Sequence, residues 1–208
     1  SDEDLTIATG GLNIQGSVLL NALNSADVSK RAGSTTASSK PRRSKTKPRM
    51  EGETAGVYLY VLNGDGTKSP AKDAEGNDVK ATLDAENSFT FNGLSEDVNY
   101  LVVYFEANAD KNYELLMQGV MFSGKALPVD TDGVPVLKLS PKTTLEAQSA
   151  IDTVKRISQE SGGAEFNQDL VTEIVIESEA GVERLVKEGL VQLPEVVVSV
   201  KTPSSVSD

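Results

Sequence analysis

Short apolar runs separated by turn-forming residues occupy the middle of the chain, and this alternation constrains the fold more than any other feature. The clearest run, Gly56–Leu62 (GVYLYVL), is rich in the β-branched and aromatic residues that favour strands. It ends at Asn63–Gly66 (NGDG), a strong turn signal. Further strands are predicted at Gly11–Leu20, Val79–Leu83, Ser88–Phe91, Asn99–Glu106, Tyr113–Phe122 and Val134–Leu139. Short strands with turns between them predict a small antiparallel β-sandwich.

A hairpin is predicted in the middle of this series. Val79–Leu83 and Ser88–Phe91 flank the turn Asp84–Asn87, which would join them as neighbouring strands. Because successive side chains of a strand point to opposite faces, Phe89 and Phe91 should lie on the same face.

A second turn is predicted directly after the hairpin, at Asn92–Gly93. The next segment, Asn99–Glu106 (NYLVVYFE), is apolar at successive positions. A strand that is apolar on both faces is typical of the centre of a sheet.

From Ser140 onward the pattern becomes helical. Thr143 and Glu146 form the T-x-x-E signature of a capping box, and Gly162–Gly163 marks the end of this first helix. An apolar stripe follows the cap, and we expect it to pack inside the protein rather than against a partner. The stripe consists of Ala147, Ala150, Ile151, Val154 and Ile157.

A second helix is predicted from Glu165, with apolar positions at Phe166, Leu170, Val171, Ile174 and Val175. A third, shorter helix would hold Val182, Leu185, Val186 and Leu190. The predicted fold class is mainly β with an α appendage, in which a small antiparallel β-sandwich is followed by two or three helices.

The predicted organisation has four parts. A flexible leader occupies 1–10, the β-sandwich 11–139, the helical appendage 140–193, and a strand with a tail 194–208. Within the last part, Val196–Val198 would form the strand. A disordered basic insertion at 21–55 would interrupt the sandwich after its first strand, because this stretch has no apolar periodicity with which to offset its ordering entropy.

The insertion divides the charge of the chain unevenly. Between Lys30 and Arg49 there are eight basic residues and no acidic one, which leaves the rest of the chain with twelve bases, 31 acids and a charge of −19. The densest part supplies the candidate contacts to an anionic surface, which are Arg42, Arg43, Lys45, Lys47 and Arg49.

Three interpretations of the basic segment stay open. It could be a solvated loop that folds back weakly onto the acidic body, or it could bind an anionic lipid or polysaccharide surface. Nucleic acid is the least favoured partner, because no aromatic residues are interleaved with the basic ones to stack on bases.

Part of the chain resembles a known superfamily. The hairpin Thr82–Leu94 (TLDAENSFTFNGL), the strand Asn99–Tyr104 (NYLVVY) and the opening strand Asn13–Val18 (NIQGSV) match its pattern. This pattern resembles the carboxypeptidase regulatory-like and transthyretin-like β-sandwiches, which include the collagen-adhesin B-type repeats. The segment Leu139–Leu145 (LSPKTTL) is similar to the one that follows such domains in bacterial surface lipoproteins.

The resemblance covers roughly half the chain and implies specific positions. Phe89 and Phe91 would point inward, Leu94 would close one end of the sandwich, and Tyr100 would be a partly buried tyrosine. Asn87 stands where the family has a glycine, a replacement that is tolerated because Asn accepts the left-handed backbone conformation.

The absence of Cys and His excludes several kinds of site. It excludes Cys–His pairs, Ser–His–Asp triads, disulfides and the usual zinc ligands. The sequence Asp130–Gly133 (DTDG) resembles one aspartic-protease motif, but no second copy exists, and a turn is favoured. Gly64–Ser69 (GDGTKS) resembles the end of a phosphate-binding loop without its leading glycine. We therefore expect no enzymatic activity.

A cluster of oxygen-bearing side chains leaves one metal site to consider. Calcium needs oxygen ligands alone, and solvated turns are the favoured alternative. The candidate ligands are Asn63, Asp65, Asp73, Glu75, Asn77 and Asp78.

These features favour an exported protein of the cell envelope, on the outer surface or in the periplasm, with a structural or adhesive role. A lipid anchor removed from the N-terminal side could tether it to a membrane, and its partner could be an anionic surface, a polysaccharide or another envelope protein. The alternative is an accessory carbohydrate- or peptide-binding module of a secreted assembly.

Overall fold

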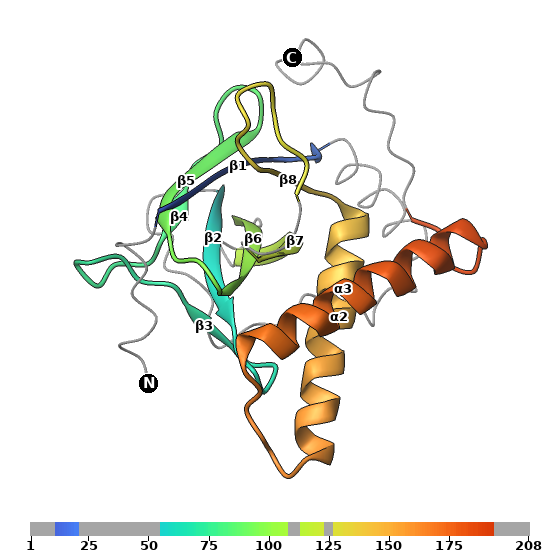
Figure 1. The fold of residues 1–208 in the computed structure, drawn as a ribbon. Coiled ribbons are helices and arrows are strands. Elements are labelled where there is room, and N and C mark those ends of the chain that lie inside the picture. Colours follow the sequence, from blue (N-terminus) through green and yellow to red (C-terminus); the bar gives the residue numbers. More distant parts are fainter. Residues whose placement is uncertain (1–10, 21–54, 108–112, 123–126, 194–208) are drawn as a thin grey trace.

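The computed structural model describes residues 11–20, 55–107, 113–122 and 127–193 (Figure 1). In chain order the elements are β1 (Leu12–Val18), β2 (Ala55–Leu62), β3 (Lys68–Pro70), β4 (Lys80–Ala81), β5 (Ser88–Leu94), β6 (Asn99–Ala107), β7 (Tyr113–Phe122), β8 (Val136–Leu139), α2 (Pro141–Glu160) and α3 (Gln168–Lys187). The predicted leader at 1–10, the strand at Val196–Val198 and all of the basic insertion except Ala55 lie outside these residues. Ala55 is the first residue of β2, so the insertion cannot extend to it.

The strands form two sheets. A three-stranded sheet has the order β5-β1-β8, and a five-stranded sheet has the order β3-β2-β6-β7, with β4 also paired to β2. The described pairings are antiparallel except that β1 runs parallel to β8, where Gln15 pairs with Val136 and Val18 with Leu139. The mainly β fold class is confirmed, and the expectation of purely antiparallel pairing is wrong for this one pair.

The predicted hairpin is wrong, although its turn exists. The chain does turn at Asp84, but β4 pairs with β2 and β5 pairs with β1, so the turn carries the chain from one sheet to the other. Phe89 and Phe91 lie on one face as predicted, with ring centroids 5.7 Å apart. Pairing β5 with β1 places both rings in a core to which the two sheets contribute. Burial of these rings therefore favours the pairing of β5 with β1.

The predicted turn at Asn92–Gly93 is also wrong, because β5 continues to Leu94. Gly93 has a φ of 72°, and its N–H donates to Oδ1 of Asn13. The register between β1 and β5 shifts here, between Leu12 and Ile14. A bulge in the strand thus uses the glycine that the sequence pattern assigns to a turn.

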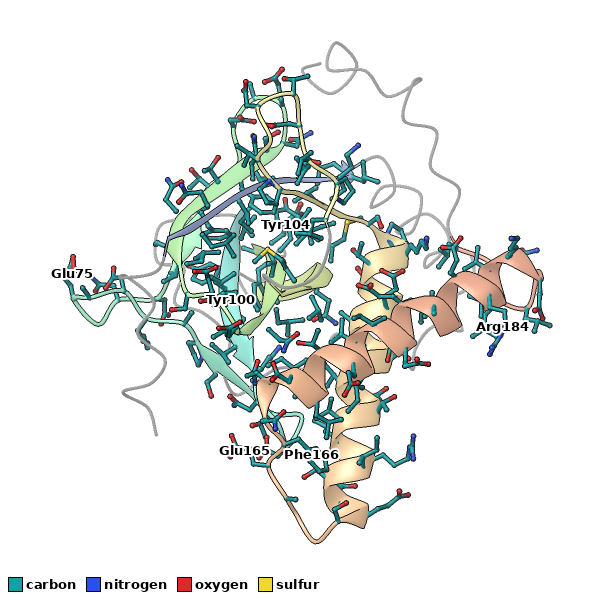
Figure 2. All side chains as sticks on the ribbon, in the orientation of Figure 1. Glu75, Tyr100, Tyr104, Glu165, Phe166 and Arg184 are labelled. Atoms are coloured by element: carbon teal, nitrogen blue, oxygen red, sulfur yellow. The ribbon has the colours of Figure 1, made fainter. Side chains whose placement is uncertain are left out.

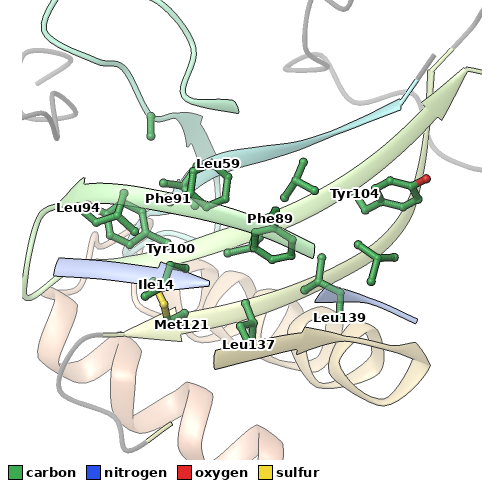
Figure 3. Close-up of a cluster of buried hydrophobic side chains, with 14 of the residues drawn as sticks. Ile14, Leu59, Phe89, Phe91, Leu94, Tyr100, Tyr104, Met121, Leu137 and Leu139 are labelled. Carbon is green, nitrogen blue, oxygen red and sulfur yellow. The ribbon is translucent and has the colours of Figure 1, made fainter. Parts of the chain in front are cut away.

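The first core lies between the two sheets (Figure 3). It contains the side chains Ile14, Val18, Val57, Leu59, Val61, Ala71, Phe89, Phe91, Leu94, Tyr100, Val102, Tyr104, Met117, Met121, Leu137 and Leu139. Leu94 and Tyr100 are fully buried, so the tyrosine is more deeply enclosed than the resemblance implies.

The second core lies on the opposite face of the five-stranded sheet, under α2 and α3. It contains Tyr58, Tyr60, Leu62, Leu101, Val103, Phe105, Val120, Ala147, Ala150, Ile151, Val154, Val171, Ile174 and Val175. Alternate residues of β2 and β6 therefore enter different cores, which confirms that Asn99–Glu106 belongs to a central strand. The apolar stripe of the first helix packs inside the protein, as predicted.

The helix α2 begins earlier than the T-x-x-E signature indicates. Ser140 is the N-cap: its side chain accepts from the Thr143 N–H, and the Thr143 hydroxyl oxygen accepts from the Ser140 N–H. Pro141 stands in the first turn, where a missing N–H costs nothing. The predicted box at Thr143 and Glu146 is thus wrong by one turn, and α2 ends before Gly162–Gly163 as expected.

The helix α3 is one continuous helix, so the separate third helix is wrong. It begins after the N-cap Asn167, which leaves the predicted residues Glu165 and Phe166 outside it. Gly181 lies within the helix without breaking it, because Ser178 and Val182 continue its buried face. The described residues contain no helix long and apolar enough to cross a membrane.

A polar seam fixes α3 to the five-stranded sheet. The fully buried Asn99 donates through its side-chain nitrogen to the Gln168 side chain at 3.0 Å and to the Thr172 hydroxyl at 3.1 Å. Gln168 in turn donates to the Leu62 carbonyl at 3.0 Å. Beside it, the Phe166 N–H donates to the Gly64 carbonyl at 3.0 Å. These hydrogen bonds set the position of α3 along the sheet.

Two glycine substitutions should have opposite effects on stability. A Cβ at position 64 would come within 1.8 Å of the Phe166 carbonyl oxygen, a backbone atom that cannot move aside freely. Gly64→Ala should therefore lower the free energy of unfolding by about 1–3 kcal/mol. Gly181→Ala meets open space and should raise it by about 1 kcal/mol, since alanine is the better helix former. Urea unfolding of both variants tests this, and equal effects would contradict the packing described.

Candidate binding surface

One five-residue turn recurs four times among the described residues. It starts at Asn63, Asp73, Asp84 and Asp130. In each copy the first N–H donates to the carbonyl four residues on, and the N–H three residues on donates back to the first carbonyl. The fourth position has a positive φ, filled by Gly66 (87°), Gly76 (85°), Asn87 (60°) and Gly133 (81°). This is a type I turn followed by a left-handed residue, common in hairpins.

The aspartates at the first position stabilise their own turns. Asp73 accepts at one oxygen from the N–H groups of Glu75 and Asn77, both at 2.9 Å. Asp84 and Asp130 repeat this pattern with the N–H groups two and four residues on. The candidate catalytic sequence Asp130–Gly133 is therefore one of these turns.

The candidate calcium ligands belong to two separate turns. Asp65 accepts from the N–H and hydroxyl of Thr67, and Asn63 donates to the hydroxyls of Thr67 and Ser69. Asp78 forms an ion pair with Lys72. The part of the chain that the structure describes contains no group of three acidic side chains placed to share a metal ion. The Gly64–Ser69 segment leads into β3 rather than into the helix that a phosphate-binding loop requires.

The buried hydroxyls of the first core belong to tyrosines. The Tyr104 hydroxyl donates to Glu106 at 2.6 Å, and the Tyr100 hydroxyl accepts from the Ser95 N–H at 2.8 Å. Burial raises the pKa of both tyrosines, and the Glu106 carboxylate raises that of Tyr104 further. Figure 2 shows Tyr100 and Tyr104 within the β-sheet region and Glu75, Glu165 and Arg184 at the periphery.

A hollow of about 680 Å³ lies where β8 meets the two helices. Its walls are largely hydrocarbon, and charged side chains stand among them. The lining residues are Val120, Leu127, Pro128, Val129, Asp130, Val136, Leu137, Lys138, Lys142, Thr143, Glu146 and Glu179. Val129 is 59% exposed here, one of the most exposed large apolar side chains among the described residues.

An ion pair between Lys142 of α2 and Glu183 of α3 stands beside this hollow. Glu183 is the main cause of the raised pKa of Lys142, and Glu146 and Glu179 raise it further. Three carboxylates thus act on one ammonium. This group is not among the sites predicted from the sequence, although Lys142 and Glu146, like Glu179 and Glu183, stand four residues apart on one helix face. The packing of α2 and α3 on the sheet decides which of their faces meet, and the sequence pattern does not reveal this packing.

A shallower groove of about 410 Å³ lies between α2 and α3. Its lining includes the apolar residues Ile157, Ile174, Val182 and Leu185. The five candidate basic residues, Arg42, Arg43, Lys45, Lys47 and Arg49, lie outside the described residues.

Comparison with known proteins gives no match: no family model fits the chain, and no curated protein or solved structure is significantly similar to it.

Replacing Asp73 should destabilise its turn. Asp73→Ala removes two charge-assisted hydrogen bonds and should lower the free energy of unfolding by about 1–2 kcal/mol. Glu75→Ala changes an exposed residue of the same turn and should stay within about 0.5 kcal/mol of the parent. Excess chelator should leave the Tm of the parent unchanged. A Tm that rises with added calcium and falls with Asp73→Ala would assign these oxygens to a metal site.

The buried tyrosines should make the fold sensitive to alkali. Their raised pKa values mean that the neutral form is favoured in the folded state, so this stabilisation is present below about pH 10 and is lost as the pH rises above it. An ultraviolet titration should show tyrosines of the native protein ionising at higher pH than in denaturant. Identical titration curves near pH 10 in both conditions would mean that the hydroxyls are exposed.

Proposed function

We propose that this chain is a non-enzymatic module of an exported cell-envelope or surface protein with a structural or adhesive role. In this proposal the two sheets form a small β-sandwich of the carboxypeptidase regulatory-like and transthyretin-like kind. The sequence resemblance motivates that assignment, and the shared core between the sheets agrees with it.

One observation carries the proposal. The five-stranded sheet has a core on each face, so both its faces are used to hold the molecule together. Three of the described turns begin with an aspartate that accepts hydrogen bonds from its own turn backbone, at Asp73, Asp84 and Asp130. Such an arrangement resists deformation, and these three aspartates stabilise turns, which suits a structural or spacing module.

The hollow beside β8 supports the alternative, an accessory module that binds a carbohydrate or a peptide. Its volume of about 680 Å³ lies within the range of small-molecule pockets, and it combines hydrocarbon walls with a few charged groups. A pocket of this composition favours a peptide with an apolar part and a charged part over an uncharged sugar, because none of the described lining residues is a Tyr, Phe or Trp on which a sugar could stack.

The location can be tested with the complete gene product. Source cells expressing it with an epitope tag should yield the protein in envelope fractions, and protease added to intact cells should remove an outer-surface form. A matched cytoplasmic protein should survive the same protease treatment. Recovery of the tagged protein from the cytoplasmic fraction alone would refute the proposed location, and with it the surface role.

A further inference from the structure

The hollow beside β8 has a composition that suits one kind of side chain. Its walls include Leu127, Val129 and Leu137, whereas Lys142, Glu146 and Glu179 supply charge. Lysine and arginine carry long hydrocarbon stems that pack on apolar surface while the charged head remains at a polar rim. An apolar hollow rimmed by carboxylates therefore fits basic side chains better than purely apolar or acidic ones.

The charge balance at the rim points the same way. Lys142 is the ion-pair partner of Glu183, and Glu146 and Glu179 act on the same ammonium. The described lining adds one further base, Lys138, and one further acid, Asp130, which accepts a hydrogen bond from Gln15. Among the described residues of the rim, together with Glu183 beside it, four acids stand against two bases, so this part of the rim attracts positive charge.

The chain itself brings positive charge to this place. The parallel pairing of β1 with β8 sets Val18 beside Leu139, and the Leu19 N–H donates to the Leu139 carbonyl at 3.0 Å. Leu139 directly precedes Ser140, the N-cap of α2. The chain therefore leaves β1 next to the first turn of α2, the turn that contributes Lys142 and Thr143 to the hollow.

The distance to the basic segment is short. Lys30 lies ten positions after Leu20, a span of at most about 36 Å when extended and about 17 Å for a flexible chain. A tether of that length keeps the segment at an effective concentration in the millimolar range. A free basic ligand would have to exceed this concentration or bind more tightly to occupy the hollow.

We propose that the hollow between β8, α2 and α3 is a docking site for the basic segment Lys30–Arg49 of the same chain. Docking neutralises part of the acidic body and covers the exposed Val129. An anionic polymer or lipid surface that binds the segment competes with the hollow for it. Docking in the acidic hollow therefore weakens the salt-sensitive binding of the segment to such a surface.

Retention on heparin, a polyanionic probe, tests this competition. The hollow variant carries Glu146→Gln, Glu179→Gln and Glu183→Gln, and the matched control carries Glu75→Gln, Glu86→Gln and Glu165→Gln at exposed sites outside the hollow. Both variants raise the net charge by three. The hollow variant should elute at clearly higher salt than the control, because its basic segment is released. Equal elution of the two variants would overturn the proposal.

Deletion of Ser34–Arg49 distinguishes release of the basic segment from a direct effect of the substitutions on the charge of the hollow. In the deletion background the hollow and control variants should elute together. A difference that persists there would come from Lys142 rather than from the segment and would overturn the proposal. Elution that changes with the protein concentration loaded would indicate docking between copies and would also contradict docking within one chain.

Direct contact can be mapped in the deletion protein by nuclear magnetic resonance. A peptide spanning Lys30–Arg49 should shift the backbone amide signals around Val129, Lys138 and Lys142, and added salt should reverse these shifts. A peptide with its Lys and Arg residues replaced by Gln serves as the control. Shifts confined to other surfaces, such as the groove between α2 and α3, or no shifts at all, would refute the hollow as the docking site.

Discussion

The structure depends on the burial of β2 and β6 from both sides. Along β6, Tyr100, Val102 and Tyr104 enter one core and Leu101, Val103 and Phe105 enter the other. A strand with apolar residues at every position cannot leave either face to water without exposing several large side chains. Two further layers are therefore required, and the chain supplies a three-stranded sheet for one face and a helix pair for the other.

Hydrophobic burial sets the layers but not their alignment, and the polar seam supplies the alignment. Asn99 is fully buried, and its hydrogen bonds to Gln168 and Thr172 have no substitute if α3 slides along the sheet. An unpaired buried amide would cost more than the hydrogen bond itself stabilises. In the first turn of α2, the Thr143 hydroxyl donates to the Gln118 carbonyl of strand β7, and the Thr144 hydroxyl oxygen accepts from the Gln118 N–H. Each helix is thus fixed to the sheet by specific polar contacts near its first turn.

The sequence predicts local structure well and pairing poorly. Most of the described strands, the inward direction of Phe89 and Phe91, and the apolar stripe of α2 follow from side-chain periodicity alone, whereas β3 lies in a polar stretch and was not predicted. β5 pairs with β1, a strand far away in the sequence, rather than with its neighbour β4. A local sequence pattern carries no information on such distant pairing, so it predicted the wrong hairpin. The separate third helix at Val182–Leu190 is wrong, because α3 runs unbroken to Lys187 and its buried face continues through Ser178 and Val182, although Gly181 disfavours helix. The repeated turn with Asn or Asp first and Gly or Asn fourth could have been recognised from the sequence. The hollow could not, since its walls come from separate elements.

The parallel pair of β1 and β8 has a kinetic consequence. Gln15 is made before the other described strands, yet its partner Val136 is added after them. The entropy cost of closing so long a loop must be offset before the pair contributes any stability, and such non-local pairing slows folding. β1 should therefore be among the last strands to complete its pairing, because it stays unpaired or paired with β5 alone until β8 has been synthesised. A ribosome-bound chain that has not reached Leu139 would carry an incomplete sheet with an open edge, a species in need of protection from aggregation.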